Sequence, residues 1–566
     1  MIGVSTLALE KHKSGDFVGV IEILQPLADK GDTLDVASLV RLAQSLYRVG
    51  RRQEAALRYR QAAVLPGAPR QPLLELAFAL LQQGKDRELT LGAARDVLEC
   101  HPRHEGAATY FRHHVHYRLD MEELERSDAE ALEKIRAGDA FQIQTELLLD
   151  HIAWCGDEAL NALIQTQNGK TFSPEARARR RARPHQFADK IRLGYLSNDW
   201  SDAHATIKLL QRVLELHDED AFEITLFCYT EDNFVAADRV FRKRFGDKLV
   251  PIGHLSTEDA AQQIRARGID ILVDLKGHTN KAWIDLVNAG PAPVQVAYLG
   301  YPGSGVGIDC DYIIGDRIVC PETSEPFFHE KFCWLPDSYQ PNDDTYRALP
   351  PPPSRSELGL PDGATVLVSA NNVRKISPET FRLWMAILAR APHTVLWMVC
   401  DDPLARRNFS RAVAKAGIAS ERIIFVNSAS YPNHIARLRA ADIGLDTFPC
   451  NGHTTTSDKL WAGLPVVTKK GSNFSSRVSE SLLRAMQLPE LVAEDGDRYV
   501  DLCVELASNG ERLRALRARI EASRATAALF DSRRYTRNLE RAFQLIYERA
   551  RQGLDPERIE VYDQPL

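Results

Sequence analysis

The stretch from Ala441 to Gly471 (ADIGLDTFPCNGHTTTSDKLWAGLPVVTKKG) constrains the fold more than any other part of the chain. It opens with an apolar run, Ile443–Leu445, that stops at polar residues, as a buried parallel strand does at its carboxyl end. A helix then begins near Lys459, and a second apolar run follows from Leu464 to Thr468. A strand, a turn, a helix and a strand in this order predict an α/β domain with a parallel sheet.

The turn within this stretch has the composition of an anion site. Asn451-Gly452-His453 is followed by Thr454, Thr455 and Thr456. A small-residue turn before a helix leaves several backbone N–H groups unpaired and directed at one spot. Such a group of donors holds a diphosphate without a metal, and threonine hydroxyls add further donors. Asp458, at the start of the same helix, could accept a hydrogen bond from a ribose or sugar hydroxyl. The alternative is a polar loop whose threonines only cap the helix.

The chain beyond residue 186 alternates between apolar runs and helical segments in the same way. Such alternation predicts doubly wound parallel sheets with ligands at the carboxyl ends of the strands. The stiff stretch Pro350–Pro353 divides the alternating region, so we expect two lobes. The expected strands cover 190–197, 222–229, 269–275, 294–299 and 312–315 in the first lobe, and 365–370, 395–399, 423–426, 443–445 and 465–468 in the second.

The first hundred residues repeat a helical pattern with a period of about 34 residues. The residues that recur are Ala8, Ala43 and Ala77, and Gly15, Gly50 and Gly84. Small residues let the two helices of a unit cross closely, and Tyr59 fills the space between them. The pattern is similar to tetratricopeptide repeats, which stack into a groove for a protein or peptide. Unrelated helical hairpins remain the alternative, because the first and third units are imperfect.

Length and composition exclude several classes of protein. A chain of 566 residues suggests roughly three or four domains. A net charge of −6 gives no global electrostatic case for nucleic acid or membrane as the main partner. No run approaches the roughly 18 apolar residues of a membrane span, and an N-terminus without a basic leader is not expected to be a signal peptide. Nine cysteines without a CxxC pair predict reduced thiols in a cytoplasm.

Four stretches together resemble one family. Asn451–Asp458, followed by Trp-Ala-Gly, resembles the nucleotide-sugar loop of protein O-GlcNAc transferases, the family 41 glycosyltransferases. Ala292–Gly305, Asn371–Pro378 and Asn433–Thr447 match the same family in the same order. The resemblance implies the α/β GT-B fold, two Rossmann-like lobes with a cleft between them, preceded by an all-α tetratricopeptide-like repeat region.

The resemblance also implies roles for single residues. Lys375 matches a lysine whose ammonium neutralises the diphosphate as the glycosidic bond breaks, in place of a divalent metal. His204 matches a histidine beside the donor and acceptor, although the proline that follows it in the family is missing here. His434 and Arg437, three apart on one helix face, match a pair that reaches the base. The donor is therefore expected at Asn372, His434, Arg437, Cys450, His453, Thr454, Thr455, Thr456 and Asp458, with Lys375 and His204 as catalytic residues.

Three charged features outside this set receive other interpretations. The run ARARRRARP, from Ala176 to Pro184, is basic enough to contact phosphate or RNA, but a solvated linker or exposed helix end is favoured. Asp309-Cys310-Asp311 spells the DxD that holds manganese in metal-dependent glycosyltransferases. Because it lies in an apolar stretch away from the phosphate loop, we predict no metal site there. Arg374 is expected to be a surface residue.

The implied activity is an inverting, metal-independent transfer of a sugar to Ser or Thr of proteins. UDP-GlcNAc is the leading donor because NGHTT with Asp458 is the O-GlcNAc form. Asp270, where animal members carry histidine, and Gly277–Thr279 instead resemble SPINDLY-type protein O-fucosyltransferases. GDP-fucose, UDP-glucose and a nonulosonic acid donor therefore stay open. A non-catalytic repeat scaffold is an alternative of another class, which the intact Lys375, His453 and Asp458 disfavour.

These inferences give a domain plan and a set of partners. We expect a bacterial-type cytoplasmic enzyme with no cofactor, binding protein acceptors through the repeat arm and a nucleotide sugar in the lobes. The sequence indicates no oligomeric state. A helical region from Tyr535 is expected to fold back across the lobes. The expected domains are 1–118 (helical repeats), 119–185 (helical connector and basic linker), 186–345 (acceptor-side lobe), 346–550 (nucleotide-sugar lobe) and 551–566 (polar tail).

Overall fold

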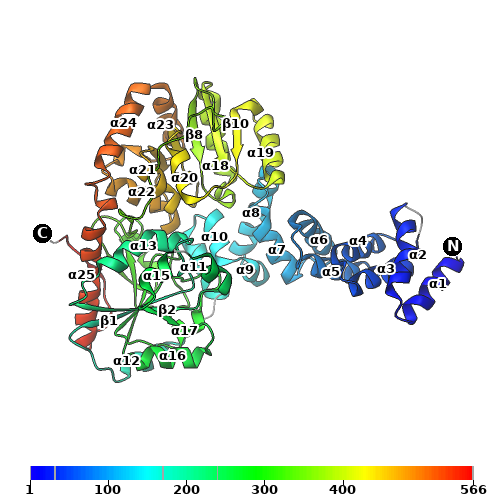
Figure 1. Ribbon diagram of the computed structural model, residues 1–566, viewed down its shortest axis with the longest axis horizontal. Helices are drawn as coiled ribbons and strands as arrows, with labels where there is room; N and C mark the ends of the chain where they lie inside the picture. Colours follow the sequence, from blue (N-terminus) through cyan, green and yellow to red (C-terminus); the bar gives the residue numbers. More distant parts are fainter. Residues whose placement is uncertain (1, 31–33, 169–170, 239, 564–566) are drawn as a thin grey trace. The chain divides into compact units, whose positions relative to one another are not determined.

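The computed structural model describes residues 2–30, 34–168, 171–238 and 240–563. Contacts divide the chain into two compact units. The first consists of Met1–Tyr117 and Asp139–Leu147, and the second of Arg118–Gly138 and Leu148–Leu566 (Figure 1).

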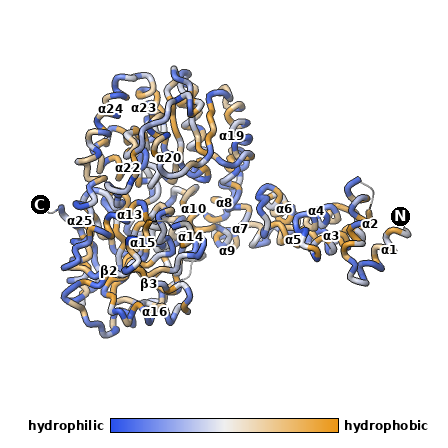
Figure 2. The backbone as a smooth tube through the Cα atoms, in the orientation of Figure 1, coloured by the Kyte–Doolittle hydropathy of each residue, from blue (hydrophilic) through white to orange (hydrophobic). Residues whose placement is uncertain are grey.

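The first unit is a stack of paired helices built on small residues. Ala8, Ala43 and Ala77, on the first helix of each pair, are fully buried. Gly15 and Gly50 adopt positive φ angles of 79° and 84° at the turns between paired helices, where a side chain would be strained. Apolar and polar residues alternate along these helices (Figure 2). A helical repeat region is confirmed. The helices of this unit are α1 (Ile2–Lys13), α2 (Phe17–Asp29), α3 (Val36–Arg48), α4 (Arg52–Ala63), α5 (Arg70–Leu81), α6 (Arg87–Cys100), α7 (Glu105–Val115) and, beyond the bound expected at 118, α9 (Ala140–Thr145).

Four helices of the second unit precede its first sheet. They contact residues far along the chain: Glu125 of α8 pairs with Arg382 at 2.9 Å, and Gln165 Nε2 of α11 donates to the hydroxyl of Tyr301 at 2.8 Å. Most of the connector expected over 119–185 therefore belongs to the second unit, whereas its Asp139–Leu147 segment belongs to the first. Its helices are α8 (Met121–Arg136), α10 (Leu148–Trp154), α11 (Glu158–Asn168) and α12 (Pro174–Ala182).

The first lobe contains an eight-stranded parallel sheet in the order β14-β7-β6-β5-β4-β1-β2-β3. The five predicted strands are present, and β3, β7 and β14 were not predicted. The strands are β1 (Ile191–Ser197), β2 (Phe222–Cys228), β3 (Leu249–Pro251), β4 (Ile271–Asp274), β5 (Val294–Ala297), β6 (Tyr312–Gly315), β7 (Lys331–Trp334) and β14 (Ile559–Glu560). The helices are α13 (Ala205–Leu216), α14 (Asp232–Ala237), α15 (Phe241–Phe245), α16 (Thr257–Ala266), α17 (Ile284–Asn288) and the 3-10 helix η1 (Glu322–Phe327).

The C-terminal helix returns to this first lobe, as predicted. α25 (Ser532–Arg551), red in Figure 1, buries Leu539, Phe543 and Ile546 completely in the core that also contains Tyr195 of β1. After α25, β14 pairs in parallel with β7, so part of the tail expected over 551–566 joins the sheet.

The second lobe contains a six-stranded parallel sheet in the order β10-β9-β8-β11-β12-β13. Its strands are β8 (Thr365–Ser369), β9 (Thr394–Val399), β10 (Ile423–Val426), β11 (Ile443–Leu445), β12 (Val466–Lys469) and β13 (Val492–Ala493). Its helices are η2 (Val373–Lys375), α18 (Pro378–Arg390), α19 (Pro403–Lys415), η3 (Ser420–Arg422), α20 (Tyr431–Leu438), α21 (Thr454–Trp461), α22 (Phe474–Ala485), η4 (Pro489–Leu491), α23 (Gly496–Ser508), α24 (Gly510–Ser523) and η5 (Ala528–Phe530).

In each sheet the winding direction reverses beside the lobe's first strand. β1 lies between β2 and β4, and β8 lies between β9 and β11. At such a switch point the flanking connections leave on opposite sides, which opens a crevice at the carboxyl ends of the strands. The fold therefore offers ligand sites after β1 and β4 in the first lobe, and after β8 and β11 in the second.

Candidate active site

One buried carboxylate organises the turn after β11. Asp446 Oδ1 accepts the backbone N–H groups of Thr447 at 2.9 Å and of Gly452 at 2.7 Å, and Oδ2 accepts the Thr468 hydroxyl at 2.7 Å. Gly452 fits where a side chain does not, because a Cβ there would lie 2.5 Å from Thr456 Oγ1. Asp446 thus ties both ends of the loop to the neighbouring strand β12.

The helix after this loop, α21, begins without a side-chain cap. His453 is its N-cap residue, and its side chain accepts no bond from the first turn. Within the described part of the chain, the backbone N–H groups of Thr454 and Thr455 have no acceptor. These two donors, together with the positive end of the helix dipole, favour an anion at this position.

The three threonine hydroxyls predicted to bind a diphosphate have different surroundings. Thr455 Oγ1 donates to Asn371 Oδ1, and the side chains of Thr454 and Thr455 are partly buried. Thr456 is fully buried and shares a hydrogen bond of 2.9 Å with the hydroxyl of Ser479. The hydroxyls of Thr455 and Thr456 are therefore both hydrogen-bonded within the protein, and Thr454 and Thr455 are the two threonines that stay partly exposed at the helix start.

Lys375 reaches this loop from the other side of the switch point. It lies on η2, directly after β8, and its Nζ donates to the carbonyl of Asn451 at 2.7 Å. Burial and the positive charge of Lys375 lower the pKa of His453 to about 3, so the imidazole is neutral. His453 Nε2 lies 3.2 Å from the carbonyl oxygen of Ser475. The structure therefore brings Lys375, His453 and the uncapped helix start together.

The residues beside Lys375 fix the loop after β8. Asn371 Nδ2 donates to Thr447 Oγ1 at 3.0 Å, which links this loop to the one after β11. Asn372 is exposed, and its side chain accepts the N–H of Arg374 at 3.1 Å. The prediction that Arg374 is a surface residue is wrong, because its side chain is mostly buried and pairs with Asp150 of α10 at 2.5 Å.

The predicted base-binding pair lies on α20, as its spacing requires. Arg437 is buried and donates to the carbonyl of Asn427 at 2.7 Å, and its Nη2 lies 3.4 Å from His434 Nδ1. Burial lowers the pKa of His434 to about 4, against the opposing effect of Asp458. His434 Nε2 lies 3.9 Å from Asp458 Oδ2. Cys450, the remaining predicted residue, is buried within the loop after β11.

Three residues near Asp458 were not predicted. The Tyr431 hydroxyl donates to Asp458 Oδ1 at 2.7 Å, and Arg347 Nη2 lies 3.4 Å from the same oxygen. Lys208, on α13 of the first lobe, places its ammonium 4.4 Å from the centre of the Tyr431 ring. Arg347 and Lys208 come from distant segments without a recognisable motif, so no local pattern identifies them.

The first lobe has its own polar pocket at its switch point. A pocket of about 430 Å³ is lined by residues that include Asp199, His204 and Lys276. Lys276 Nζ lies 2.9 Å from each carboxylate oxygen of Asp199, and His204 Nε2 lies 3.5 Å from Asp199 Oδ1. The structure thus places His204 at the start of α13, beside an ion pair that the sequence analysis did not single out.

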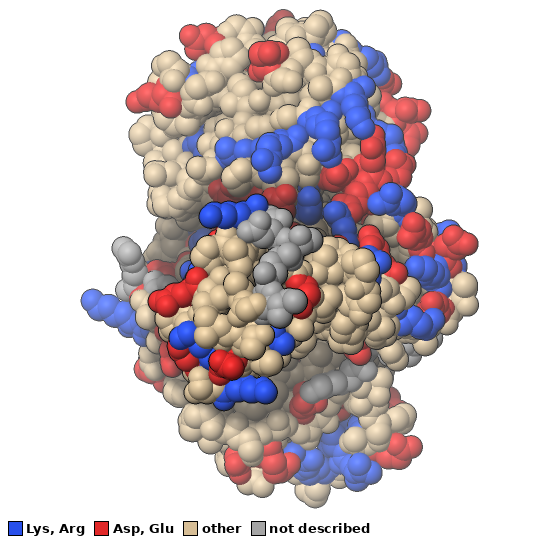
Figure 3. Space-filling model, turned by 90° about the vertical axis from the view of Figure 1, so that its right-hand side faces the viewer, with Lys and Arg blue, Asp and Glu red and all other residues tan. Residues whose placement is uncertain are grey.

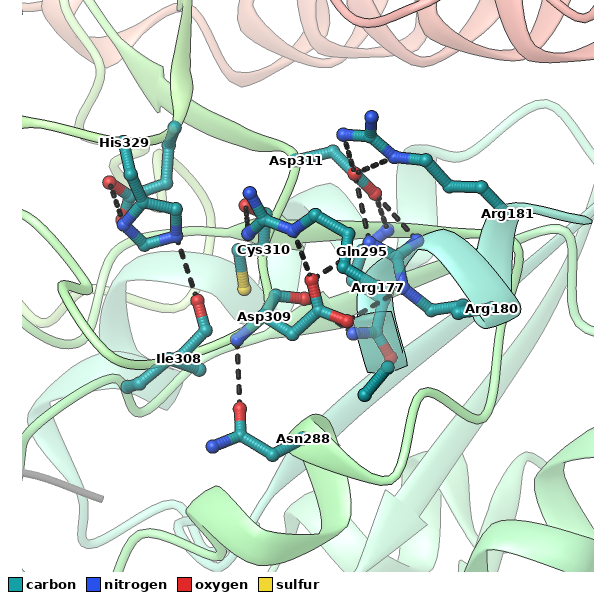
Figure 4. Close-up of polar contacts among 12 residues, drawn as sticks. Arg177, Arg180, Arg181, Asn288, Gln295, Ile308, Asp309, Cys310, Asp311 and His329 are labelled. Carbon is teal, nitrogen blue, oxygen red and sulfur yellow. Dashed lines mark hydrogen bonds and ion pairs between the residues drawn. The ribbon is translucent and has the colours of Figure 1, made fainter. Parts of the chain in front are cut away.

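The two charged motifs set aside above bind each other (Figure 4). Arg180 of α12 is 1% exposed and pairs with Asp309 at 2.8 Å and with Asp311 at 2.9 Å. Arg177 pairs with Asp309 at 2.6 Å, and Arg181 with Asp311 at 2.8 Å. The basic run is therefore not a solvated linker, and that interpretation is wrong. Both carboxylates of the DxD motif are bound by guanidinium groups.

Asp270, where the resemblance departs from animal members, is also bonded within the protein. Its carboxylate contacts His185 Nε2 at 2.7 Å and Arg192 Nη2 at 2.9 Å, and it is fully buried. Burial alone raises the pKa of this carboxyl, but the bonds from His185 and Arg192 bring it below its ordinary value. Asp270 therefore ties the segment before β1 to the start of β4.

The surface carries charges of both signs. On the face shown in Figure 3, basic and acidic side chains lie side by side. Arg411 and Lys415 of α19 pair with Asp120 and Glu122 at 2.8 Å and 2.5 Å. None of the helices in the described ranges is long and apolar enough to cross a membrane.

Comparison with known proteins agrees with this architecture. The family model for glycosyl transferase family 41 matches residues 176–349 and 351–539. A probable UDP-N-acetylglucosamine--peptide N-acetylglucosaminyltransferase SEC from Arabidopsis thaliana is 32% identical over 386 residues, covering 67% of this chain and 39% of that protein. A SPINDLY protein with the same enzyme name, from Petunia hybrida, is 30% identical over 371 residues, covering 63% of this chain and 38% of its own length.

A solved structure supports the same fold. The mutant O-GlcNAc transferase from Thermobaculum terrenum superposes with a TM-score of 0.69 at 24% identity, over 92% of this chain and 99% of that one. The predicted GT-B fold with a preceding helical repeat region is thereby confirmed. The chain spans only about two fifths of the length of the two plant relatives.

Proposed function

This chain belongs to glycosyl transferase family 41, and we propose that it transfers N-acetylglucosamine from UDP-GlcNAc to serine or threonine hydroxyls of proteins. The observation that carries the proposal is the convergence at the second-lobe switch point. There, the uncapped start of α21 and the ammonium of Lys375 lie at one loop. His434 and Arg437 lie on the adjacent helix α20 and supply a site for the base. The helix start and Lys375 suit the diphosphate of a nucleotide, and His434 and Arg437 suit its base.

In the proposed mechanism, the acceptor hydroxyl attacks the anomeric carbon and UDP leaves with inversion. Negative charge grows on the diphosphate as the glycosidic bond breaks. Lys375 Nζ and the N–H groups of Thr454 and Thr455 are fixed in place before reaction, so they stabilise this charge at no further cost in reorganisation. His204, in the opposite lobe, is the proposed acceptor-side residue.

The proposed chemistry uses no metal and no cofactor. Lys375 and the helix start supply the positive charge that a divalent cation provides in other transferases. Asp309 and Asp311 are bound by three arginines, which makes them unsuitable as ligands of a diphosphate-bound ion.

The proposed partners are protein acceptors, held by the helical unit, and a nucleotide sugar in the second unit. Stacked helical pairs present an extended surface that suits a protein or peptide. We place the enzyme in a reducing cytoplasm, because its nine cysteines are unpaired and eight of them are buried.

Intact-mass analysis tests the donor and the activity together. Candidate acceptors are co-expressed with the protein and supplied with UDP-GlcNAc, UDP-glucose, GDP-fucose or an activated nonulosonic acid. An increment of one N-acetylhexosamine is expected, and another increment would identify another donor. A protein that binds UDP but modifies no acceptor with any donor would instead support the non-catalytic scaffold.

A further inference from the structure

The ring of His204 uses both of its nitrogens within the protein. Nδ1 accepts the N–H of Thr206 at 3.3 Å as the N-cap of α13, so this nitrogen carries no proton. Burial lowers the pKa of His204, which favours the neutral ring, with its proton on Nε2. Nε2 lies 3.5 Å from Asp199 Oδ1. In this arrangement His204 donates through Nε2, and neither ring nitrogen has a free lone pair that could accept a proton from a substrate.

Asp199 is the neighbouring group that retains lone pairs. Asp199 is 8% exposed and lines the pocket of about 430 Å³. Each oxygen accepts one bond of 2.9 Å from Lys276 Nζ, and a carboxylate oxygen has room for a second donor. An acceptor hydroxyl in the pocket can therefore bond to Asp199 without displacing Lys276.

Lys276 is itself held in place. Asp274 accepts the backbone N–H groups of Lys276 at 3.1 Å and of Gly277 at 2.9 Å, which fixes the turn after β4. Since β1 and β4 are adjacent, the side chain of Lys276 reaches Asp199 directly across the switch point. This ion pair therefore lies where the fold of the first lobe places its ligand crevice.

We propose that Asp199 is the catalytic base of the sugar transfer and that Lys276 is the positioning residue that orients its carboxylate. The inference rests on the proposed transferase function. The acceptor oxygen bonds to the anomeric carbon while the bond from that carbon to the diphosphate oxygen breaks. The diphosphate keeps the electron pair, and the hydroxyl proton passes to an oxygen of Asp199. The Nε2–H of His204 orients the same carboxylate.

Several charged or titratable groups act on Asp199. They are Lys276 after β4, His204 before α13, Asp274 at the end of β4 and Tyr229 after β2. Lys276 is the nearest cation, at 2.9 Å. A variant that lacks its charge therefore tests, through the pH dependence of transfer, whether Lys276 acts on this carboxylate.

The test is the pH profile of transfer, measured beside UDP binding on the same samples. Asp199→Asn should lower transfer by about 10²- to 10⁴-fold, the contribution of a general base. UDP binding should remain, because the nucleotide loop is in the other lobe. Lys276→Met should lower turnover in part, because the carboxylate of Asp199 loses the cation that orients it, and should also change the pH dependence of transfer. As a matched control, Lys248→Met, in an exposed pair with Glu219 on the same lobe, should leave the profile unchanged.

The outcomes separate the inference from the proposed function. If Asp199→Asn keeps the acidic limb and His204→Gln removes it, His204 is the base and the inference is wrong, while the transferase function stands. If Asp199→Asn does not fold, the Asp199→Asn/Lys276→Met protein, which removes both charges of the buried pair, replaces it. Normal transfer by that double variant would overturn the inference, and loss of transfer with UDP binding retained would support it.

A wild-type protein that binds UDP but transfers no sugar contradicts the proposed function, and the inference falls with it.

Discussion

At the scale of single residues, Lys375 carries the most direct prediction. Its ammonium is held by the carbonyl of Asn451 at 2.7 Å, next to the uncapped helix start. If it stabilises charge that develops as the bond breaks, its effect belongs mainly to the transition state. Lys375→Ala should then lower turnover by on the order of a hundredfold or more. Affinity for UDP, measured by calorimetry, should fall less, because Thr454, Thr455 and the α20 pair remain.

Two further variants make this prediction specific. Lys375→Arg should rescue only in part, because the longer planar guanidinium does not occupy the position of an ammonium. Lys470→Ala, at an exposed pair with Glu494, is the matched control and should behave as the wild type. A folded Lys375→Ala protein with near-normal turnover would show that the active site has been assigned to the wrong residue.

The proposed role of Lys375 also predicts that sugar transfer does not depend on a metal ion. Because Lys375 and two backbone N–H groups provide the positive charge, transfer should survive excess EDTA. The rate is measured with and without chelator, and again after adding manganese. Complete loss that manganese restores would contradict a metal-independent mechanism.

The sequence places candidate residues close together in space where they lie close together along the chain. The two residues on α20 and the loop after β11 are separated only by β11 and its short connection, so strand, turn and helix periodicity bring them to one end of the sheet. Asp199 and Lys276 lie far apart in the sequence, as do Arg347 and Asp458. Only the topology of the sheets and the packing of the lobes bring such residues together, and neither leaves a local pattern.

At the scale of elements, α12 is attached to the first lobe by buried charges. Arg180 is 1% exposed and bonds to both Asp309 and Asp311. Arg180→Met should lower the free energy of unfolding by about 3–5 kcal/mol, because it leaves buried carboxylates with too few partners. Chemical denaturation measures the change. Arg179→Met, at an exposed position one residue earlier on the same helix, should have little effect.

This destabilisation should depend on pH. In the wild type, burial raises the pKa of Asp311 but the charge of Arg180 lowers it further, so the net value lies below the ordinary 3.8. A lowered carboxyl pKa stabilises the fold above the unfolded-state value, and this contribution is lost as pH falls through the folded-state value. In Arg180→Met the buried carboxyl protonates more easily. The difference in free energy of unfolding between the wild type and Arg180→Met should therefore become smaller below about pH 4. A difference that does not change with pH would show that lost packing, and not lost charge, causes the destabilisation.

The sequence predicts those strands that are long and buried. Strands such as β1 and β8 are continuous apolar runs between helical segments, so their existence and approximate bounds follow from the sequence. β3, β13 and β14 have two or three residues, and β3 ends in Pro251, so no period can be read from them. α12 was misjudged for a different reason: an arginine-rich helix looks solvated until its acidic partners, more than a hundred residues away, are known.

At the scale of the whole molecule, the second unit brings its two lobes to one site. Lys208 of α13 lies one helical turn after His204 and contacts Tyr431, which bonds to Asp458 of α21. Residues proposed for the acceptor and for the donor are therefore connected through a single helix. The compact second unit contains all of this machinery, and none of the proposed site residues belongs to the first unit.

That division predicts separable functions. Deleting residues 1–100 removes α1 to α6, which make up most of the first unit, and leaves the proposed site residues intact. UDP affinity and slow hydrolysis of the donor should stay close to the full-length values, because both depend on the second unit. Transfer to the natural protein acceptor should weaken, because the helical surface proposed to bind it is gone, whereas transfer to a short Ser-containing peptide should change less. The comparison of protein with peptide acceptor, at matched UDP binding, isolates recognition from chemistry. A truncated protein that modifies its natural acceptor as fast as the full chain would show that the helical unit does not select the acceptor.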